Sequence, residues 1–144
     1  MNISIKRLHP SVALPSYQTV GAAAMDVQAA IDEPVTLAPL ERRVIPLGFA
    51  LELPVGYEAQ IRPRSGLSLK QGLTLANAIG TIDSDYRGEV GAIIVNLSNE
   101  PVIIEPLQRI AQMVITTYEQ ISWQPTEELS ETDRGDGAYG STKH

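Results

Sequence analysis

The stretch GTIDSDYRGE, residues 80–89, has the composition of a turn between two strands. The segments that flank it, residues 73–79 and 90–97, are rich in β-branched and aliphatic side chains, which favour strands. Ser and Asp favour turns because their side chains hydrogen-bond nearby backbone N–H groups. The pattern therefore predicts a tight β-hairpin whose connection is unusually rich in chemically reactive side chains.

The rest of the chain also predicts strands. Prolines recur throughout and leave almost no window for a long helix. One short helix is expected at residues 67–71, with Ser65 as its N-cap and Gly72 directly after its end. Strands are expected at residues 3–6, 43–53, 57–62, 73–79, 90–97, 102–105 and 109–117. We therefore expect an all-β domain, a sandwich or a barrel.

Composition narrows the class of protein. The 144 residues suit one domain, and its core must be mostly aliphatic because aromatic residues make up only 5%. The absence of cysteine excludes disulfides, thiolate metal sites and cysteine nucleophiles. A net charge of -6 argues against a nucleic-acid partner. No apolar run approaches the ~20 residues of a membrane span, so we expect no membrane association and a cytoplasmic location.

One sequence pattern occurs twice. Residues 33–42 and 100–109 share the frame E-P-V-x-(L/I)-x-P-L-x-R. We interpret each copy as a short strand, a Pro-Leu corner and the start of the next strand. This interpretation gives Arg109 a structural role like that of Arg42.

Three segments carry candidate chemistry. Asp83 follows the apolar Ile82 at the end of an expected strand, and a fixed carboxylate near Tyr86 suits a general base that orients a water beside a flat substrate. The residues around Arg64 directly precede the expected helix. The free N–H groups at a helix start attract anions, so this segment is a candidate phosphate-binding site. Asp26 fits either a surface turn or an outer ligand of a hydrated Mg²⁺.

The end of the chain differs from the rest. After residue 124 it becomes acidic and nearly devoid of apolar residues, and residues 134–143 are glycine-rich with Arg, Ser, Thr, Lys and Tyr139. A disordered tail and a flexible arm that orders over a phosphorylated ligand both fit this composition. We divide the chain into a β core, residues 1–124, and a C-terminal arm, residues 125–144.

Together these segments resemble a known family, the homotrimeric deoxyuridine triphosphate nucleotidohydrolases, or dUTPases. The family has five ordered motifs, and matching stretches occur here in the same order at residues 17–26, 63–67, 80–89, 109–112 and 134–142. The resemblance implies a distorted jelly-roll or β-barrel fold and a homotrimer. It also implies Mg²⁺-dependent hydrolysis of dUTP to dUMP and pyrophosphate, which keeps uracil out of DNA and supplies dUMP for dTMP synthesis.

The resemblance also assigns roles to residues. It implies that Asp83 orients the water that attacks the α-phosphorus, that Gln112 and Arg134 assist catalysis, and that Asp26 meets Mg²⁺ through water. The arm would reach a neighbouring subunit, where Tyr139 would stack over the uracil. The implied substrate-binding residues are Arg64, Ser65, Gly66, Asn77, Tyr86, Tyr139, Ser141 and Thr142.

The sequence departs from the family pattern at a few positions. Ala24, Ala138 and Lys143 stand where glycines are usual, and Tyr139 replaces the commoner phenylalanine. These changes bear on the geometry of the arm and not on the class of reaction.

Two other functions are alternatives for this sequence. One is a dCTP deaminase of the same superfamily, of which the zinc type is excluded because the chain has no cysteine ligands. The other is a trimeric β module that binds nucleotide and signals to a protein partner.

Overall fold

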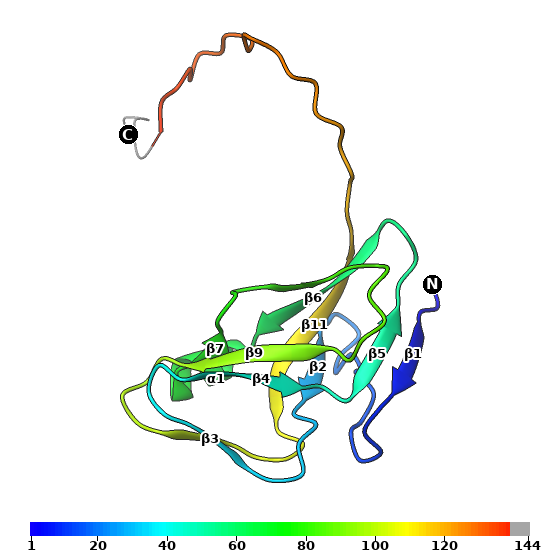
Figure 1. Cartoon of the computed structure of the whole chain (residues 1–144), viewed down its shortest axis with the longest axis vertical. Helices are drawn as coiled ribbons and strands as arrows, with labels where there is room; N and C mark the ends of the chain where they lie inside the picture. Colours follow the sequence, from blue (N-terminus) through cyan, green and yellow to red (C-terminus); the bar gives the residue numbers. More distant parts are fainter. Residues whose placement is uncertain (139–144) are drawn as a thin grey trace.

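The computed structural model describes residues 1–138 and consists of short strands with one short helix (Figure 1). The expected all-β class with a single helix is confirmed. In chain order the elements are β1 (Ser4–Arg7), β2 (Met25–Gln28), β3 (Val35–Leu37), β4 (Arg42–Pro46), β5 (Phe49–Glu52), β6 (Tyr57–Pro63), α1 (Ser65–Gln71), β7 (Leu73–Leu75), β8 (Gly80–Ile82), β9 (Gly91–Asn96), β10 (Val102–Ile104) and β11 (Arg109–Thr117).

The strands form four small sheets around an aliphatic core. A four-stranded sheet has the order β2-β11-β6-β8, a three-stranded sheet has the order β4-β9-β7, and β1-β5 and β10-β3 are two-stranded. Within residues 1–138 these sheets do not close into a single barrel. The largest fully buried side chains are Phe49, Leu37, Ile45, Leu47, Ile61, Ile94 and Ile104. The expectation that aliphatic residues carry the core is therefore confirmed.

The expected strand at residues 43–53 is in fact two strands. Gly48 separates β4 from β5 and adopts a left-handed φ of 76°. A Cβ atom at this position would lie 2.9 Å from the Cβ atoms of both Ala30 and His9, so the turn also needs the small size of glycine. Strand β3 is the short strand expected in the first copy of the repeat, whereas β2 and β8 are not expected from the sequence because each has only three or four residues and too little periodicity to detect.

The stretch at residues 80–89 is not the tight hairpin connection that the sequence predicts. Strands β7 and β9 do pair as antiparallel neighbours, with Leu73 opposite Asn96. The chain between them leaves that sheet, however, and its β8 segment pairs with β6 in the four-stranded sheet. The loop that carries Asp83 is therefore anchored to both sheets.

The helix also differs at its start. Ser65 is its first residue and not its N-cap; the N-cap is Arg64, whose extended backbone has a φ of -96° and which makes no side-chain capping hydrogen bond. The expected end is confirmed, because Gly72 adopts the left-handed conformation with a φ of 68°.

The repeated sequence frame forms a structural repeat. Its two short strands, β3 and β10, pair with each other, and the corner residues Leu40 and Leu107 have φ angles of 64° and 61°. At equivalent positions the Glu41 carboxylate accepts a hydrogen bond from the Ala38 N–H, and the Gln108 amide oxygen accepts one from the Glu105 N–H, each at 2.9 Å. The strand, corner and strand interpretation is confirmed.

Charge distinguishes the two corners. Two hydrogen bonds to the Glu41 carboxylate lower the pKa of Glu41. The larger effect comes from the Ala38 N–H and the next from the Arg43 guanidinium. The second corner is neutral at this position because it carries Gln108. Acid can therefore weaken the first corner but not the second.

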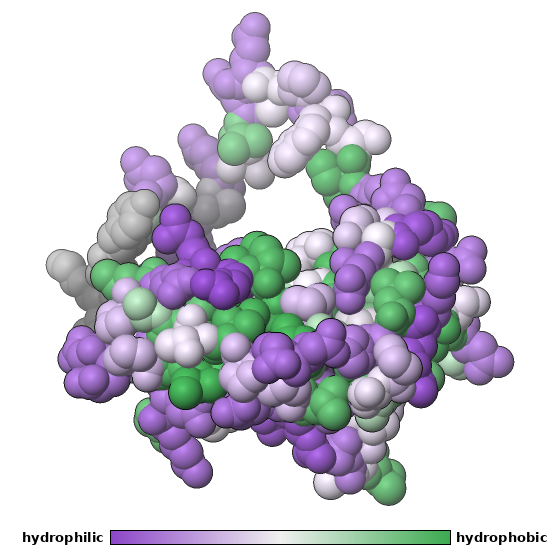
Figure 2. Space-filling view, turned by 60° about the horizontal axis from the view of Figure 1, so that its bottom comes forward, coloured by the Kyte–Doolittle hydropathy of each residue, from purple (hydrophilic) through white to green (hydrophobic). Residues whose placement is uncertain are grey.

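Beyond β11 the chain runs away from the core (Figure 1). Along this segment Ile121, Trp123 and Leu129 are exposed, and apolar side chains occur on it as well as on the surface of the core (Figure 2). The part of the chain that the structure describes contains no helix with the length and hydrophobicity of a membrane span.

A buried asparagine joins the repeat to the three-stranded sheet. The Asn96 side chain is fully buried at the end of β9, and its Nδ2 donates to the carbonyl oxygens of Leu37 at 3.0 Å and Glu100 at 2.8 Å. Its Oδ1 accepts hydrogen bonds from the N–H and the hydroxyl of Ser98 at 2.8 and 2.7 Å. Every hydrogen-bonding group of this amide is thus used in the dry interior.

We predict that Asn96→Leu, which keeps the volume but removes both donors, lowers the free energy of unfolding by about 2–4 kcal/mol because two buried carbonyl groups lose their partner. Urea unfolding of the purified variants measures this. Ser98→Ala is the matched control, since it removes only a half-buried hydroxyl and should change the free energy by less than about 1 kcal/mol. Equal losses in the two variants would contradict the role of Asn96.

Candidate active site

Three of the expected site residues lie in one cleft, the Asp83 cleft. It has a volume of about 350 Å³ and brings together Asn77, Asp83 and Tyr86. Asp83 directly follows β8, as the sequence predicts, and its side chain is exposed at the cleft. The remaining lining residues are Val44, Gly80, Thr81, Ile82, Glu89, Gly91 and Ile93.

The loop after Asp83 is held by its own hydrogen bonds. The Tyr86 N–H donates to the Asp83 carbonyl oxygen at 3.2 Å, and the Tyr86 hydroxyl donates to the Glu89 carbonyl oxygen at 2.9 Å. The Arg87 guanidinium donates to the Ser84 carbonyl oxygen at 2.7 Å. These contacts fix the position of the Tyr86 ring in the Asp83 cleft.

Asn77 lies next to a strained residue. Ala78 has a φ of 59°, a conformation that costs about 1–2 kcal/mol for a residue with a Cβ atom. The Ala78 N–H donates to the Leu75 carbonyl oxygen at 3.2 Å, and the Ile79 N–H donates to the Asn77 carbonyl oxygen at 2.6 Å. Strain of this kind is typical of ligand-binding loops.

A second cleft, the Arg64 cleft, contains the candidate phosphate residues. Arg64, Ser65 and Gly66 line it at the start of α1, and Asp26 and Gln112 line it from the neighbouring strands. The Gln112 amide donates from Nε2 to the Pro63 carbonyl oxygen at 2.8 Å, which fixes the chain just before Arg64. Lys70, which the sequence did not single out, lines the same cleft from α1.

Asp26 is held by two arginines. Its Oδ1 lies 3.0 Å from the Arg64 Nε, and its Oδ2 lies 3.2 Å from an Arg109 Nη. The surface-turn alternative for Asp26 therefore does not hold, because the residue is part of β2 and its side chain is only 18% exposed. Arg109, which the repeat suggested to be purely structural, joins this cluster.

The residues fit a hydrated magnesium ion and not a dehydrated one. Residues 1–138 contain no group of three or more His, Cys, Asp or Glu side chains placed to hold a metal. Asp26 offers one carboxylate, and both of its oxygens already form ion pairs with guanidinium groups. Mg²⁺ commonly keeps several waters and binds through one or two carboxylates together with substrate phosphates, which this donor set permits.

The two clefts lie far apart within one chain and share no lining residue. Ile82 is paired with Ala59, so Asp83 is next to position 58 of β6, whereas Arg64 follows the end of that strand. The six residue steps from position 58 to position 64 correspond to about 20 Å of extended strand. One chain therefore does not place Asp83 and Arg64 around the same small molecule.

The remaining expected residues belong to the C-terminal segment. Arg134 is exposed there, and its Nε donates to the Gly137 carbonyl oxygen at 2.9 Å. Tyr139, Ser141, Thr142 and Lys143 lie outside the described residues.

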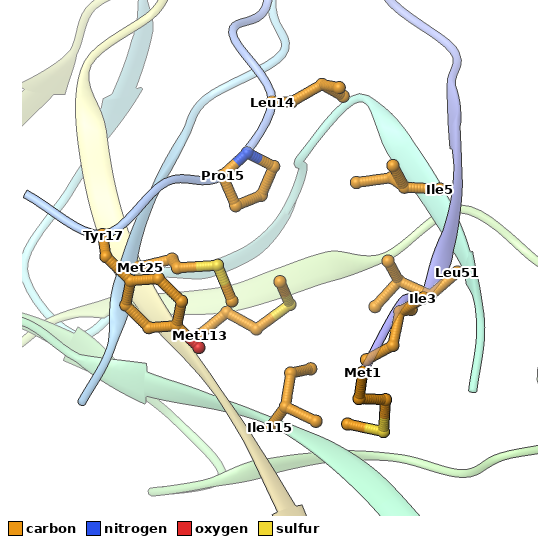
Figure 3. Close-up of a pocket in the computed structure, with 10 residues that line it drawn as sticks. All are labelled: Met1, Ile3, Ile5, Leu14, Pro15, Tyr17, Met25, Leu51, Met113 and Ile115. Carbon is orange, nitrogen blue, oxygen red and sulfur yellow. The ribbon is translucent and has the colours of Figure 1, made fainter. Parts of the chain in front are cut away.

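A third pocket is apolar and of a different character (Figure 3). It has a volume of about 300 Å³ between β1 and the four-stranded sheet, and its lining contains no charged side chain. The lining residues are Met1, Ile3, Ile5, Leu14, Pro15, Tyr17, Met25, Leu51, Met113 and Ile115.

These features define a class of protein. An aromatic ring and a carboxylate in one cleft, with arginines and a helix start in another, suit a protein that handles a flat, phosphorylated ligand. Comparison with known proteins gives the family, because residues 11–143 match the dUTPase family model. The chain belongs to the dUTPase family.

Individual relatives agree with this assignment. A deoxyuridine 5'-triphosphate nucleotidohydrolase of Finegoldia magna is 54% identical over 129 residues, 90% of each chain. Among solved structures, the dUTPase of Staphylococcus bacteriophage 80alpha, in complex with dUpNHpp, is 27% identical with a TM-score of 0.89 over 99% of each chain. The jelly-roll-like β fold implied by the resemblance is confirmed.

We predict that Gly88→Ala displaces the Tyr86 ring, because a Cβ atom at Gly88 would lie 2.6 Å from the ring carbon Cζ. The expected loss in the free energy of unfolding is about 1–3 kcal/mol, as for other overpacked sites. A crystal structure of the variant shows the ring position, and thermal unfolding measures the stability. Gly21→Ala is the control, since its Cβ atom would meet nothing within 4 Å. An unmoved ring would contradict the prediction.

Proposed function

We propose that this protein hydrolyses dUTP to dUMP and pyrophosphate, and thereby limits uracil in DNA and supplies dUMP for dTMP synthesis. The observation that carries the proposal is that Asn77, Asp83 and Tyr86 share one cleft in a member of the dUTPase family. The 54% identity to a named nucleotidohydrolase over most of the chain supports the same activity.

In the proposed reaction Asp83 orients and deprotonates the water that attacks the α-phosphorus. The bond from this phosphorus to the bridging oxygen of the β-phosphate breaks, so pyrophosphate leaves and dUMP remains. The exposed position of Asp83 directly after a strand supports this role, since the carboxylate is accessible and its backbone is fixed.

Substrate selection belongs to the same cleft in this proposal. The Tyr86 ring, held by the bond from its hydroxyl to Glu89, packs against the deoxyribose and leaves no room for a 2′-hydroxyl. Asn77 hydrogen-bonds the edge of the uracil together with nearby backbone groups. Base and sugar are then chosen by one loop.

The Arg64 cleft holds the triphosphate in this proposal. Arg64, Ser65, Gly66 and Gln112 supply donors for the phosphate oxygens. Asp26 would hold a hydrated Mg²⁺ through water, and the bound ion would neutralise part of the phosphate charge. The acidic net charge of the protein is compatible with this arrangement, because the phosphates would contact only the positive groups of this cleft and not the protein surface as a whole.

A complete site then needs more than one copy of the chain. We propose a homotrimer in which the Asp83 cleft of one subunit faces the Arg64 cleft of its neighbour. The separation of about 20 Å between the two groups along β6 supports this arrangement, since a single chain cannot close around the nucleotide. The arm, residues 125–144, completes the site in a neighbouring subunit, where Arg134, Ser141 and Thr142 contact the phosphates and Tyr139 stacks over the uracil.

The first test measures pyrophosphate and ammonia release from dUTP, dTTP, dCTP and UTP, with Mg²⁺ and with a chelator. We expect pyrophosphate from dUTP alone, with the rate lowered by chelation. Asp83→Asn should keep the fold and lower kcat by about 10²–10⁴-fold, the usual contribution of a general base. Ammonia from dCTP would identify a deaminase, and no product from any substrate would overturn the proposal.

A second prediction concerns the shared site. Asp83→Asn and Arg64→Ala chains should each be weakly active alone, and activity should return when they are mixed and allowed to exchange subunits. Random assortment leaves roughly a quarter of the sites intact. The control mixes Asp83→Asn with a chain that carries both changes, because no chain then supplies Asp83. Absence of recovery after verified subunit exchange would place both groups in the same chain.

A further inference from the structure

A β-bulge places Arg109 on the face of the sheet that carries Asp26 and Gln112. Arg109 and Gln112 are three positions apart, so a regular strand would point them to opposite faces. Between Arg109 and Ala111, however, the register with β2 shifts, so that Arg109 is opposite Gln28 and Gln112 is opposite Asp26. Positions 26 and 28 share one face of β2, and the extra residue of the bulge therefore brings Arg109 to that face.

Arg109 contacts both charged residues of the Arg64 cleft. Its Nη1 donates to the Asp26 Oδ2 at 3.2 Å, and its carbonyl oxygen accepts a hydrogen bond from the Arg64 Nη1 at 3.0 Å. Arg64 in turn pairs through its Nε with the Asp26 Oδ1 at 3.0 Å. The backbone carbonyl of Arg109 thus orients the Arg64 guanidinium. The Arg109 side chain orients the Asp26 carboxylate, which forms an ion pair with the same guanidinium.

The charge of the cluster depends on Arg109. An ionised Asp26 repels phosphate oxygens. A pair formed by Asp26 and Arg64 alone would have no net charge. The second guanidinium leaves the cluster of Asp26, Arg64 and Arg109 with one net positive charge. Arg64 and Asp26 are each more than two-thirds shielded from water, with exposed fractions of 32% and 18%, so the charges are screened less than on an open surface.

We propose that Arg109 is a positioning residue for the phosphate half of the site, which neutralises Asp26 and fixes Arg64 in the orientation that binds the triphosphate. This inference rests on the proposed function. Lys70 also lines the cleft and adds positive charge, but the simultaneous contact with Asp26 and Arg64 is made by Arg109.

The internal repeat supplies a matched control. Arg42 occupies the position equivalent to Arg109, directly after the first Pro-Leu corner. It begins β4, which pairs with β9 in unbroken register, and it forms no ion pair within the described residues. Any general effect of removing an arginine at this place in the fold should therefore also occur in Arg42→Ala.

The test compares steady-state kinetics with dUTP and thermal unfolding for Arg109→Ala, Arg109→Lys and Arg42→Ala. We expect Arg109→Ala to raise KM by about 10–100-fold, the range for loss of a charge-assisted hydrogen bond, with a much smaller change in kcat. Arg109→Lys should recover part of the loss because it restores the charge without the guanidinium geometry. Arg42→Ala should leave both constants within about twofold, the scatter of a substitution outside such a network.

A double-mutant cycle separates the positioning role from a direct one. If Arg109 acts through Asp26, then Arg109→Ala should raise KM several-fold less in an Asp26→Asn background than in the parent protein. Additive effects on KM, or equal losses in Arg109→Ala and Arg42→Ala, would overturn the inference. Lack of dUTP hydrolysis by the parent protein would instead overturn the proposed function, so the two failures are distinguishable.

Discussion

The hydrogen-bonded pairing of β11 with β2 on one side and β6 on the other is the constraint on which the phosphate half of the site depends. It aligns Asp26, Gln112 and position 62 in one row across the sheet. The bulge in β11 then adds Arg109 to the same face. Side chains from three distant parts of the sequence thereby lie on hydrogen-bonded strands. Such strands hold side chains more precisely than loops do.

The base and sugar half is built by different means. Asp83, Tyr86 and Asn77 lie on a connection that leaves one sheet, joins another for three residues and returns. Local hydrogen bonds and one left-handed alanine shape it. The fully satisfied amide of Asn96 secures the sheet from which this connection departs, so the interior of the domain and the position of the loop are coupled.

Much of this molecule could be predicted from its sequence, because prolines, turn residues and β-branched runs all favour short strands. The five motifs gave the family and led to the residues of both clefts. The predictions of a single strand at residues 43–53 and of a tight hairpin were wrong because both depend on which distant strand the backbone pairs with. The Ser65 cap was wrong because the helix begins earlier, with the extended Arg64 as its N-cap. The internal repeat suggests a structural role for Arg109 by analogy with Arg42, and regular alternation along a strand would place Arg109 on the face opposite Gln112. In the structure Ile110 and Ala111 are both buried, as expected at a bulge, but the sequence shows this only as two adjacent apolar residues.

The distance between the two clefts of one chain has a consequence for how such an enzyme would come into being. A newly made, correctly folded subunit would have a stable core and yet no ability to process nucleotide. Catalytic output would then rise with more than the first power of protein concentration at low abundance, because association precedes function. A chain defective in one cleft would also impair neighbours of normal sequence, so loss of function would spread through mixed assemblies.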